Sequence, residues 1–262
     1  GVMGVVGYLI SPSAVFFVTA ALLIPTWLTL RTIAPREIDP EQAHGSEPMP
    51  RKPNDRQAEP RAPIDLRRLL LRSPLLIFGG CILLFHLANA AMLPLMGSVL
   101  TTRLSDWATV LIAACMVGPQ LIVAVFSPWV GRQAQRWGRR PLLIAGFAFL
   151  PIRGALFATV SDPYLLVAVQ LLDGLTASVF SVLVPLTIAD LTRGTGRFNL
   201  TQGMVGTMTG LGASLSPTLA GYVTDSYDSS VAFLSLATVA AVGLTAVTLL
   251  MPETRPPPDP PP

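Results

Sequence analysis

The sequence predicts an all-α membrane protein that crosses the bilayer several times. Charged residues make up 13% of its 262 residues, about half of the roughly 25% that is usual in soluble domains. The mean hydropathy is +0.57, and the chain is a series of apolar segments, each close to the roughly 20 residues that a helix needs to span a bilayer. Helices are expected because a membrane β-strand is only about ten residues long and alternates in polarity.

The expected spans lie near residues 14–33, 74–98, 107–130, 141–160, 163–188, 200–224 and 230–251. A pI of about 9.2 could indicate a nucleic-acid-binding protein, but the net charge is only +3. The basic residues also lie between membrane-length segments. Nucleic acid is therefore not an expected partner.

The arginines of the short loops predict the orientation of the spans. Arg103 is alone on one side of the membrane, and the other side carries Arg132, Arg136, Arg139, Arg140, Arg193 and Arg197. Positively charged short loops remain on the cytoplasmic side. The loops near residues 105–106, 161–162 and 225–228 are then short, acidic and external.

Residues 34–73 form the longest polar segment, rich in proline and in charges of both signs. Such a composition cannot bury a core and predicts a cytoplasmic linker. Its end, LRRLLLR at residues 66–72, is either an amphipathic segment on the inner headgroups or a solvated loop end.

The two ends of the chain resemble each other. Residues 7–11 read GYLIS before SAVFFVTA at 13–20, and residues 221–225 read GYVTD before SVAFLSLA at 230–237. Two similar helix bundles joined by a linker would produce this internal sequence similarity. We therefore expect residues 1–33 to be about one and a half helices of an N-terminal bundle. Residues 74–251 would be a six-helix C-terminal bundle, and 252–262 a proline-rich cytoplasmic tail.

The stretch GRQAQRWGRR at residues 131–140 resembles the loop signature of the major facilitator superfamily of transporters. That signature is a glycine, a small residue and an acid, followed by Arg-x-Gly-Arg-Arg. The matching residues are Gly131, Ala134, Arg136, Gly138, Arg139 and Arg140, whereas Gln135 stands where the stronger copy of the motif has aspartate. PETR at 252–255 is similar to a common family ending. The resemblance implies a cytoplasmic loop that latches neighbouring helices; the alternative is a simple topology anchor.

Three ionisable residues are expected near the middle of the membrane: His86, Arg153 and Asp173. His86 and Arg153 lie roughly 18 Å from the cytoplasmic ends of their spans, and Asp173 lies roughly 15 Å from the outer end of its span. Buried charges are costly enough to require a partner or a cavity. Arg153 and Asp173 are the natural pair, as a structural tie or in substrate or ion coupling. Asn89 and Gln170 lie one turn from His86 and Asp173, and Gln120 is a further cavity candidate. The His86 and Asn89 face could instead hydrogen-bond a neighbouring helix.

The resemblance implies a secondary transporter that moves a small molecule by alternating access. Proton-coupled efflux across a bacterial inner membrane is the expected activity. The expected partners are the bilayer, the substrate, protons and the rest of the N-terminal bundle. No cofactor, metal site or enzymatic activity is expected, and Cys81 and Cys115 are predicted to be packing residues. The alternative is a truncated or partner-dependent membrane protein without transport activity of its own.

Overall fold

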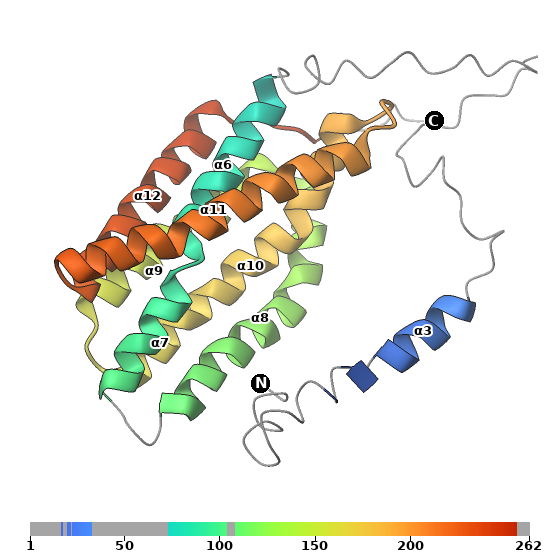
Figure 1. Ribbon diagram of the computed structural model, residues 1–262. Coiled ribbons are helices and arrows are strands. Elements are labelled where there is room, and N and C mark those ends of the chain that lie inside the picture. Colours follow the sequence, from blue (N-terminus) through green and yellow to red (C-terminus); the bar gives the residue numbers. More distant parts are fainter. Residues whose placement is uncertain (1–16, 18–19, 22, 33–72, 104–107, 256–262) are drawn as a thin grey trace, which may run out of the picture.

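The computed structural model describes residues 17, 20–21, 23–32, 73–103 and 108–255, and every regular element in these ranges is a helix (Figure 1). The helices are α3 (Leu23–Thr32), α6 (Ser73–Asn89), α7 (Met92–Arg103), α8 (Ala108–Trp137), α9 (Arg140–Thr159), α10 (Pro163–Thr192), α11 (Phe198–Ser226) and α12 (Ser229–Leu250). The all-α prediction is confirmed. The expected linker at 34–73 lies almost entirely outside the described residues, and α3 is the main described part of the span expected near 14–33.

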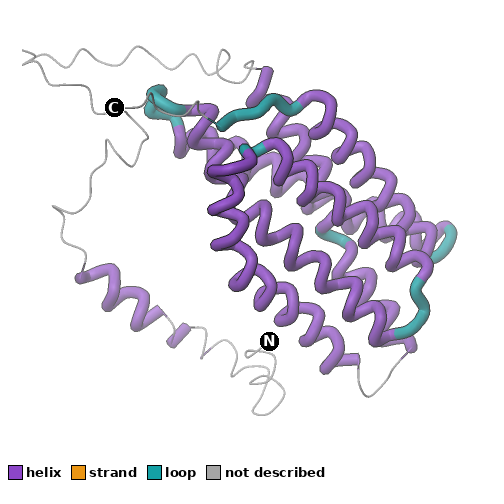
Figure 2. Tube along the Cα trace, turned by 180° about the vertical axis from the view of Figure 1, so that it is seen from behind, coloured by secondary structure: helices purple, strands orange, loops and turns teal. Residues whose placement is uncertain are grey.

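Within the described ranges, five helical segments are long and apolar enough to cross a membrane: Pro74–Arg103, α8, α9, α10 and α12. α11 has 29 residues but is not among them, because its glycines, serines and threonines lower its hydropathy. It nevertheless packs within the bundle, against α6 and α12 (Figure 1). Figure 2 shows these long helices side by side, joined mostly by short loops at the two ends of the bundle.

The segment expected as one continuous span at 74–98 is interrupted. α6 ends at Asn89 and α7 begins at Met92, because Pro94 has no backbone N–H to donate to the carbonyl of Ala90 and its ring crowds that carbonyl. The freed N–H of Ala91 donates to Ser216 Oγ of α11 at 2.9 Å, in a buried position. The break is therefore held by a neighbouring helix.

Close contacts between backbones bring the helices of the core together. A Cβ added at Gly174 of α10 would lie 2.7 Å from the Pro119 carbonyl oxygen of α8, and one at Gly154 of α9 would lie 2.9 Å from Ala237 Cβ of α12. Phe85 of α6 stacks on Phe180 of α10, with ring centroids 3.9 Å apart. Cys81 and Cys115 are buried and free, consistent with packing.

Two of the acidic loops expected on the outer side serve as helix caps. The Asp162 carboxylate accepts hydrogen bonds from the Tyr164 and Leu165 N–H groups at 2.9 Å, and the Asp228 carboxylate accepts one from Val231 N–H at 2.7 Å. Each satisfies N–H groups that the first turn of a helix leaves free. These acids therefore start α10 and α12.

Candidate functional site

A polar cluster, formed by Asn89, Arg153, Gln170 and Asp173, joins three helices beside the α6–α7 break. Arg153 of α9 is 2% exposed. Its Nη1 donates to Asp173 Oδ1 of α10, and its Nη2 donates to Asn89 Oδ1, at the last residue of α6. The same Nη2 lies 3.4 Å from Met92 Sδ, at the first residue of α7. The ion pair predicted from the sequence is present, and Arg153 also contacts both sides of the break.

The cluster is electrically neutral but its hydrogen bonding is incomplete. Gln170 Nε2 donates to Asp173 Oδ2 at a long 3.5 Å. Gln170 Oε1 and Arg153 Nε are buried, and neither has a partner within the described residues. The Asp173 side chain is 27% exposed, so it is the member of the ion pair that a solute could reach.

The other two cavity candidates do not join the cluster. His86 is half-buried, and its ring packs edge-on against Phe85 at 5.2 Å between centroids. Gln120 is exposed on α8, and neither side chain hydrogen-bonds to a described residue. The structure therefore brings together four of the six predicted cavity residues.

The arginine motif is mostly helical, which corrects the expectation of a loop over residues 131–140. α8 continues to Trp137 and α9 begins at Arg140, so Gly131 lies inside α8 rather than at a chain reversal. Gly138 and Arg139 connect the two helices. Gly138 has a φ of +95°, a backbone conformation that residues other than glycine rarely adopt. The end of the bundle that carries this turn is called the motif end below.

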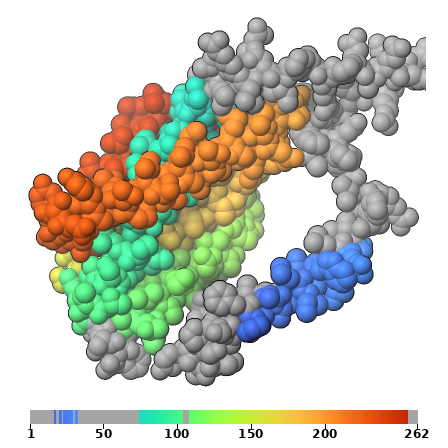
Figure 3. Space-filling model, viewed as in Figure 1, coloured from blue at the N-terminus to red at the C-terminus, as the bar shows by residue number. Residues whose placement is uncertain are grey.

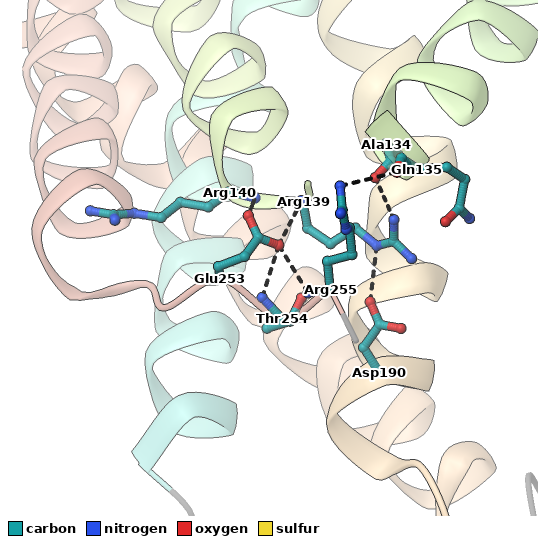
Figure 4. Close-up of polar contacts among 8 residues, drawn as sticks. All are labelled: Ala134, Gln135, Arg139, Arg140, Asp190, Glu253, Thr254 and Arg255. Carbon is teal, nitrogen blue, oxygen red and sulfur yellow. Dashed lines mark hydrogen bonds and ion pairs between the residues drawn. The ribbon is translucent and has the colours of Figure 1, made fainter. Parts of the chain in front are cut away.

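The segment after α12 holds the turn, in an arrangement called here the C-terminal clip, formed by Glu253 and Arg255 (Figure 4). The Glu253 carboxylate accepts hydrogen bonds from the backbone N–H groups of Arg139 at 2.8 Å and Arg140 at 3.1 Å, at the start of α9. Arg255 Nη1 donates to the carbonyls of Gln135 at 3.1 Å and Arg136 at 2.8 Å, in the last turn of α8. The clip thus supplies an anion to one helix end and a cation to the other, as their dipoles favour.

The electrostatics of Glu253 reflect these bonds. Partial burial alone would raise the pKa of its carboxyl. The N–H groups of Arg139, Arg255, Arg140 and Thr254 outweigh that effect, so the pKa lies below its usual range. An ionised carboxylate at this position is the form that the turn stabilises.

Arg139 and Arg140 extend the clip to two more helices. Arg139 Nε donates to Asp190 Oδ2 of α10 at 2.9 Å, in a pair whose side chains are 4% and 10% exposed. Its Nη1 donates to the carbonyl of Ala134 at 2.5 Å, and Arg140 Nη2 donates to the carbonyl of Thr248 of α12 at 2.6 Å. Asp190 lies in the last part of α10.

Comparison with known proteins agrees with this architecture. Residues 106–262 match the sequence profile of the Major Facilitator Superfamily. An uncharacterized MFS-type transporter of Mycobacterium tuberculosis, present in two strains, is 38% identical over 254 residues, which are 97% of this chain and 59% of the relative. The chain therefore spans 59% of the length of these relatives.

More distant partial matches are two Escherichia coli proteins. The class B tetracycline resistance protein is 31% identical over 102 residues, 39% of this chain and 25% of that protein. The class E protein is 32% identical over the same length. With most of the helical bundle inside the matched region, the chain belongs to the Major Facilitator Superfamily.

Proposed function

We propose that the chain is the C-terminal part of a secondary active transporter that moves a small molecule by alternating access. Residues 74–251 would form the C-terminal bundle, 1–33 the end of the N-terminal bundle, 34–73 the cytoplasmic linker and 252–262 a cytoplasmic tail. The family comprises membrane transporters and not enzymes, and the protein is integral to the membrane. Its placement in a bacterial inner membrane, with the motif end cytoplasmic, is part of the proposal.

The observation that carries this proposal is the polar cluster. A buried Arg153 is costly within a bilayer, and such residues usually mark a transport pathway or a coupling site. Asp173 is partly exposed and can exchange between Arg153 and a solute. We assign Arg153 and Asp173 to coupling and His86, Asn89, Gln120 and Gln170 to the cavity lining.

Proton-coupled export of an amphipathic compound is the proposed activity. Two partial relatives are named as tetracycline resistance proteins, which supports outward movement of a small molecule. At the motif end, Glu253 accepts hydrogen bonds from the Arg139 and Arg140 N–H groups, and Arg255 donates to the Gln135 carbonyl. These contacts support a latch formed by the motif and the C-terminal clip.

The test is transport by the longest natural chain that contains these residues, reconstituted in vesicles with and without a proton uncoupler. The variants Arg153→Asp and Asp173→Arg are assayed singly and together, with membrane insertion measured in parallel. Coupling by the pair predicts that each single variant inserts but does not transport, and that the double variant regains part of the activity. A membrane protein without its own transport activity predicts no uncoupler-sensitive flux from any of the chains.

A further inference from the structure

The four arginines of residues 131–140 divide into two groups with different surroundings. Arg139 and Arg140 hydrogen-bond to Asp190, Ala134 and Thr248. Arg132 and Arg136 are exposed, and their guanidinium groups have no hydrogen bond or ion pair with any residue in the described ranges. Within the described residues, two of the motif's four guanidinium groups therefore have polar partners and two do not.

The two outward arginines continue an exposed apolar line along α8. α8 is the least buried of the five membrane-spanning segments, and Figure 3 shows it (green) at the surface of the bundle. Leu121 is 64% exposed and Val125 71%. Steps of three or four residues keep side chains on one helix face, and this face carries, in order, Leu121, Val125, Trp129, Arg132 and Arg136.

Aromatic rings mark the transition from the apolar to the basic part of this line. Trp129 lies against Trp137 with ring centroids 5.9 Å apart, and against Phe126 at 6.5 Å. Trp137 is 57% exposed. Tryptophan is enriched where hydrocarbon meets headgroups, so the order along α8 is apolar, aromatic and then cationic.

The length of this face matches one leaflet of a bilayer. Leu121 and Arg136 are 15 positions apart in the sequence, which corresponds to about 22 Å along a helix. Half of a bilayer including its headgroups measures roughly 20–22 Å. Asp190 and Glu253, acids at this end of the described bundle, are engaged by Arg139 and by the N–H groups of the turn. Neither of these two acids pairs with Arg132 or Arg136.

We propose that this face of α8 is a binding site for one anionic phospholipid. The phosphate lies between Arg132 and Arg136, the interfacial part of the lipid contacts Trp129 and Trp137, and an acyl chain follows Val125 and Leu121. A headgroup with a net negative charge is preferred to a zwitterionic one, because the two guanidinium groups attract the net charge. This site is separate from the polar cluster and does not depend on transport.

The test uses Trp129 and Trp137 as fluorescent reporters, in the longest natural chain with its other tryptophans changed to phenylalanine. The protein is reconstituted in phosphatidylcholine vesicles that contain a minor fraction of nitroxide-labelled phosphatidylglycerol or nitroxide-labelled phosphatidylcholine. The label is on an acyl carbon near the glycerol. We expect phosphatidylglycerol to quench at about five-fold lower concentration than phosphatidylcholine, and this preference to weaken as salt is raised. Both leaflets carry the label, so the result is independent of protein orientation.

The decisive variant is Arg132→Gln/Arg136→Gln, which removes both charges from exposed helix positions. It is expected to abolish the preference and leave quenching by labelled phosphatidylcholine unchanged. The matched control, Arg193→Gln/Arg197→Gln, removes two charges at the same end of the bundle and is expected to retain the preference. Equal quenching by the two lipids in the unmodified chain overturns the proposal, as does a preference that survives the decisive variant. Protection from both labelled lipids also overturns it, because protein would then cover the face.

Discussion

The ion pair of the polar cluster predicts an asymmetric response to the loss of either partner. Asp173→Asn leaves the Arg153 charge without a counter-charge in a site where its side chain is 2% exposed, with only neutral acceptors: Asn89, Met92 and the new amide oxygen. Arg153→Met leaves a carboxylate that is 27% exposed and can be hydrated or protonated. Asp173→Asn is therefore expected to destabilise the bundle more.

The magnitudes follow from the cost of isolated buried charges. Removing one partner of a buried pair costs about 3–5 kcal/mol, and the hydrogen bond kept by Asn89 places Asp173→Asn near 3 kcal/mol. Arg153→Met is expected to cost about 1.5 kcal/mol, mainly from unpaired polar groups. The double variant contains neither charge and is expected to cost about 2 kcal/mol. The pair then has a coupling energy of about 2.5 kcal/mol.

The assay is reversible unfolding of the purified protein in mixed micelles with increasing dodecyl sulfate, followed by tryptophan fluorescence. Asp225→Asn, a neutralised acid in an exposed position, is the control and is expected to change stability by less than about 0.5 kcal/mol. The reasoning is refuted if the two single variants cost the same and the double variant is additive within about 0.5 kcal/mol.

Three further predictions concern local structure and can be measured by the same unfolding assay. Glu253→Gln is expected to cost about 1 kcal/mol, as for loss of a helix cap. Because the pKa of Glu253 is lowered in the folded state, its contribution to the free energy of unfolding is present above the unfolded pKa of about 4.5 and is lost as the pH falls through the folded pKa. A destabilisation by Glu253→Gln that does not change with pH would contradict this. Gly138→Ala is expected to cost at least about 1–2 kcal/mol, since φ is +95° and the new Cβ would lie 2.4 Å from Glu253 Oε2. Ser216→Ala removes the acceptor of the Ala91 N–H and is expected to cost about 1–3 kcal/mol. The control, Ser214→Ala, is at an exposed position and should be nearly neutral. Equal costs would argue against a stabilising role of Ser216 at the α6–α7 break.

Five of the seven expected spans and the central ion pair could be predicted from the sequence because both follow from the low polarity of the bilayer. Long apolar runs have to be helical in hydrocarbon, and a buried Arg153 needs a counter-charge, which Asp173 provides. Asn89, which also accepts a hydrogen bond from Arg153, was predicted only as a polar neighbour of His86. Its role as a ligand of Arg153 depends on how α6 and α9 pack, and periodicity does not determine that.

The C-terminal clip could not be predicted, because the sequence does not say which distant segment will supply an acid to a helix end. Glu253 and Arg139 are separated by 114 positions. The interruption between α6 and α7 had a local signal in Pro94, but a hydropathy average does not detect it, since both sides of the break are apolar enough to count as one span. The helical extension of α8 to Trp137 was missed because its last turn is polar and projects beyond the apolar span.

The clip also has a consequence for biosynthesis. The α8–α9 turn leaves the ribosome long before Glu253 and Arg255 are translated, because the contacts join residues up to 120 positions apart. Until then, the helix ends that meet at Gly138 have to be satisfied by water or lipid. The contacts of Glu253 and Arg255 with the α8–α9 turn therefore form only after α8 and α9 have been synthesised. A fusion tag placed directly after Met251 would separate this turn from Glu253 and Arg255.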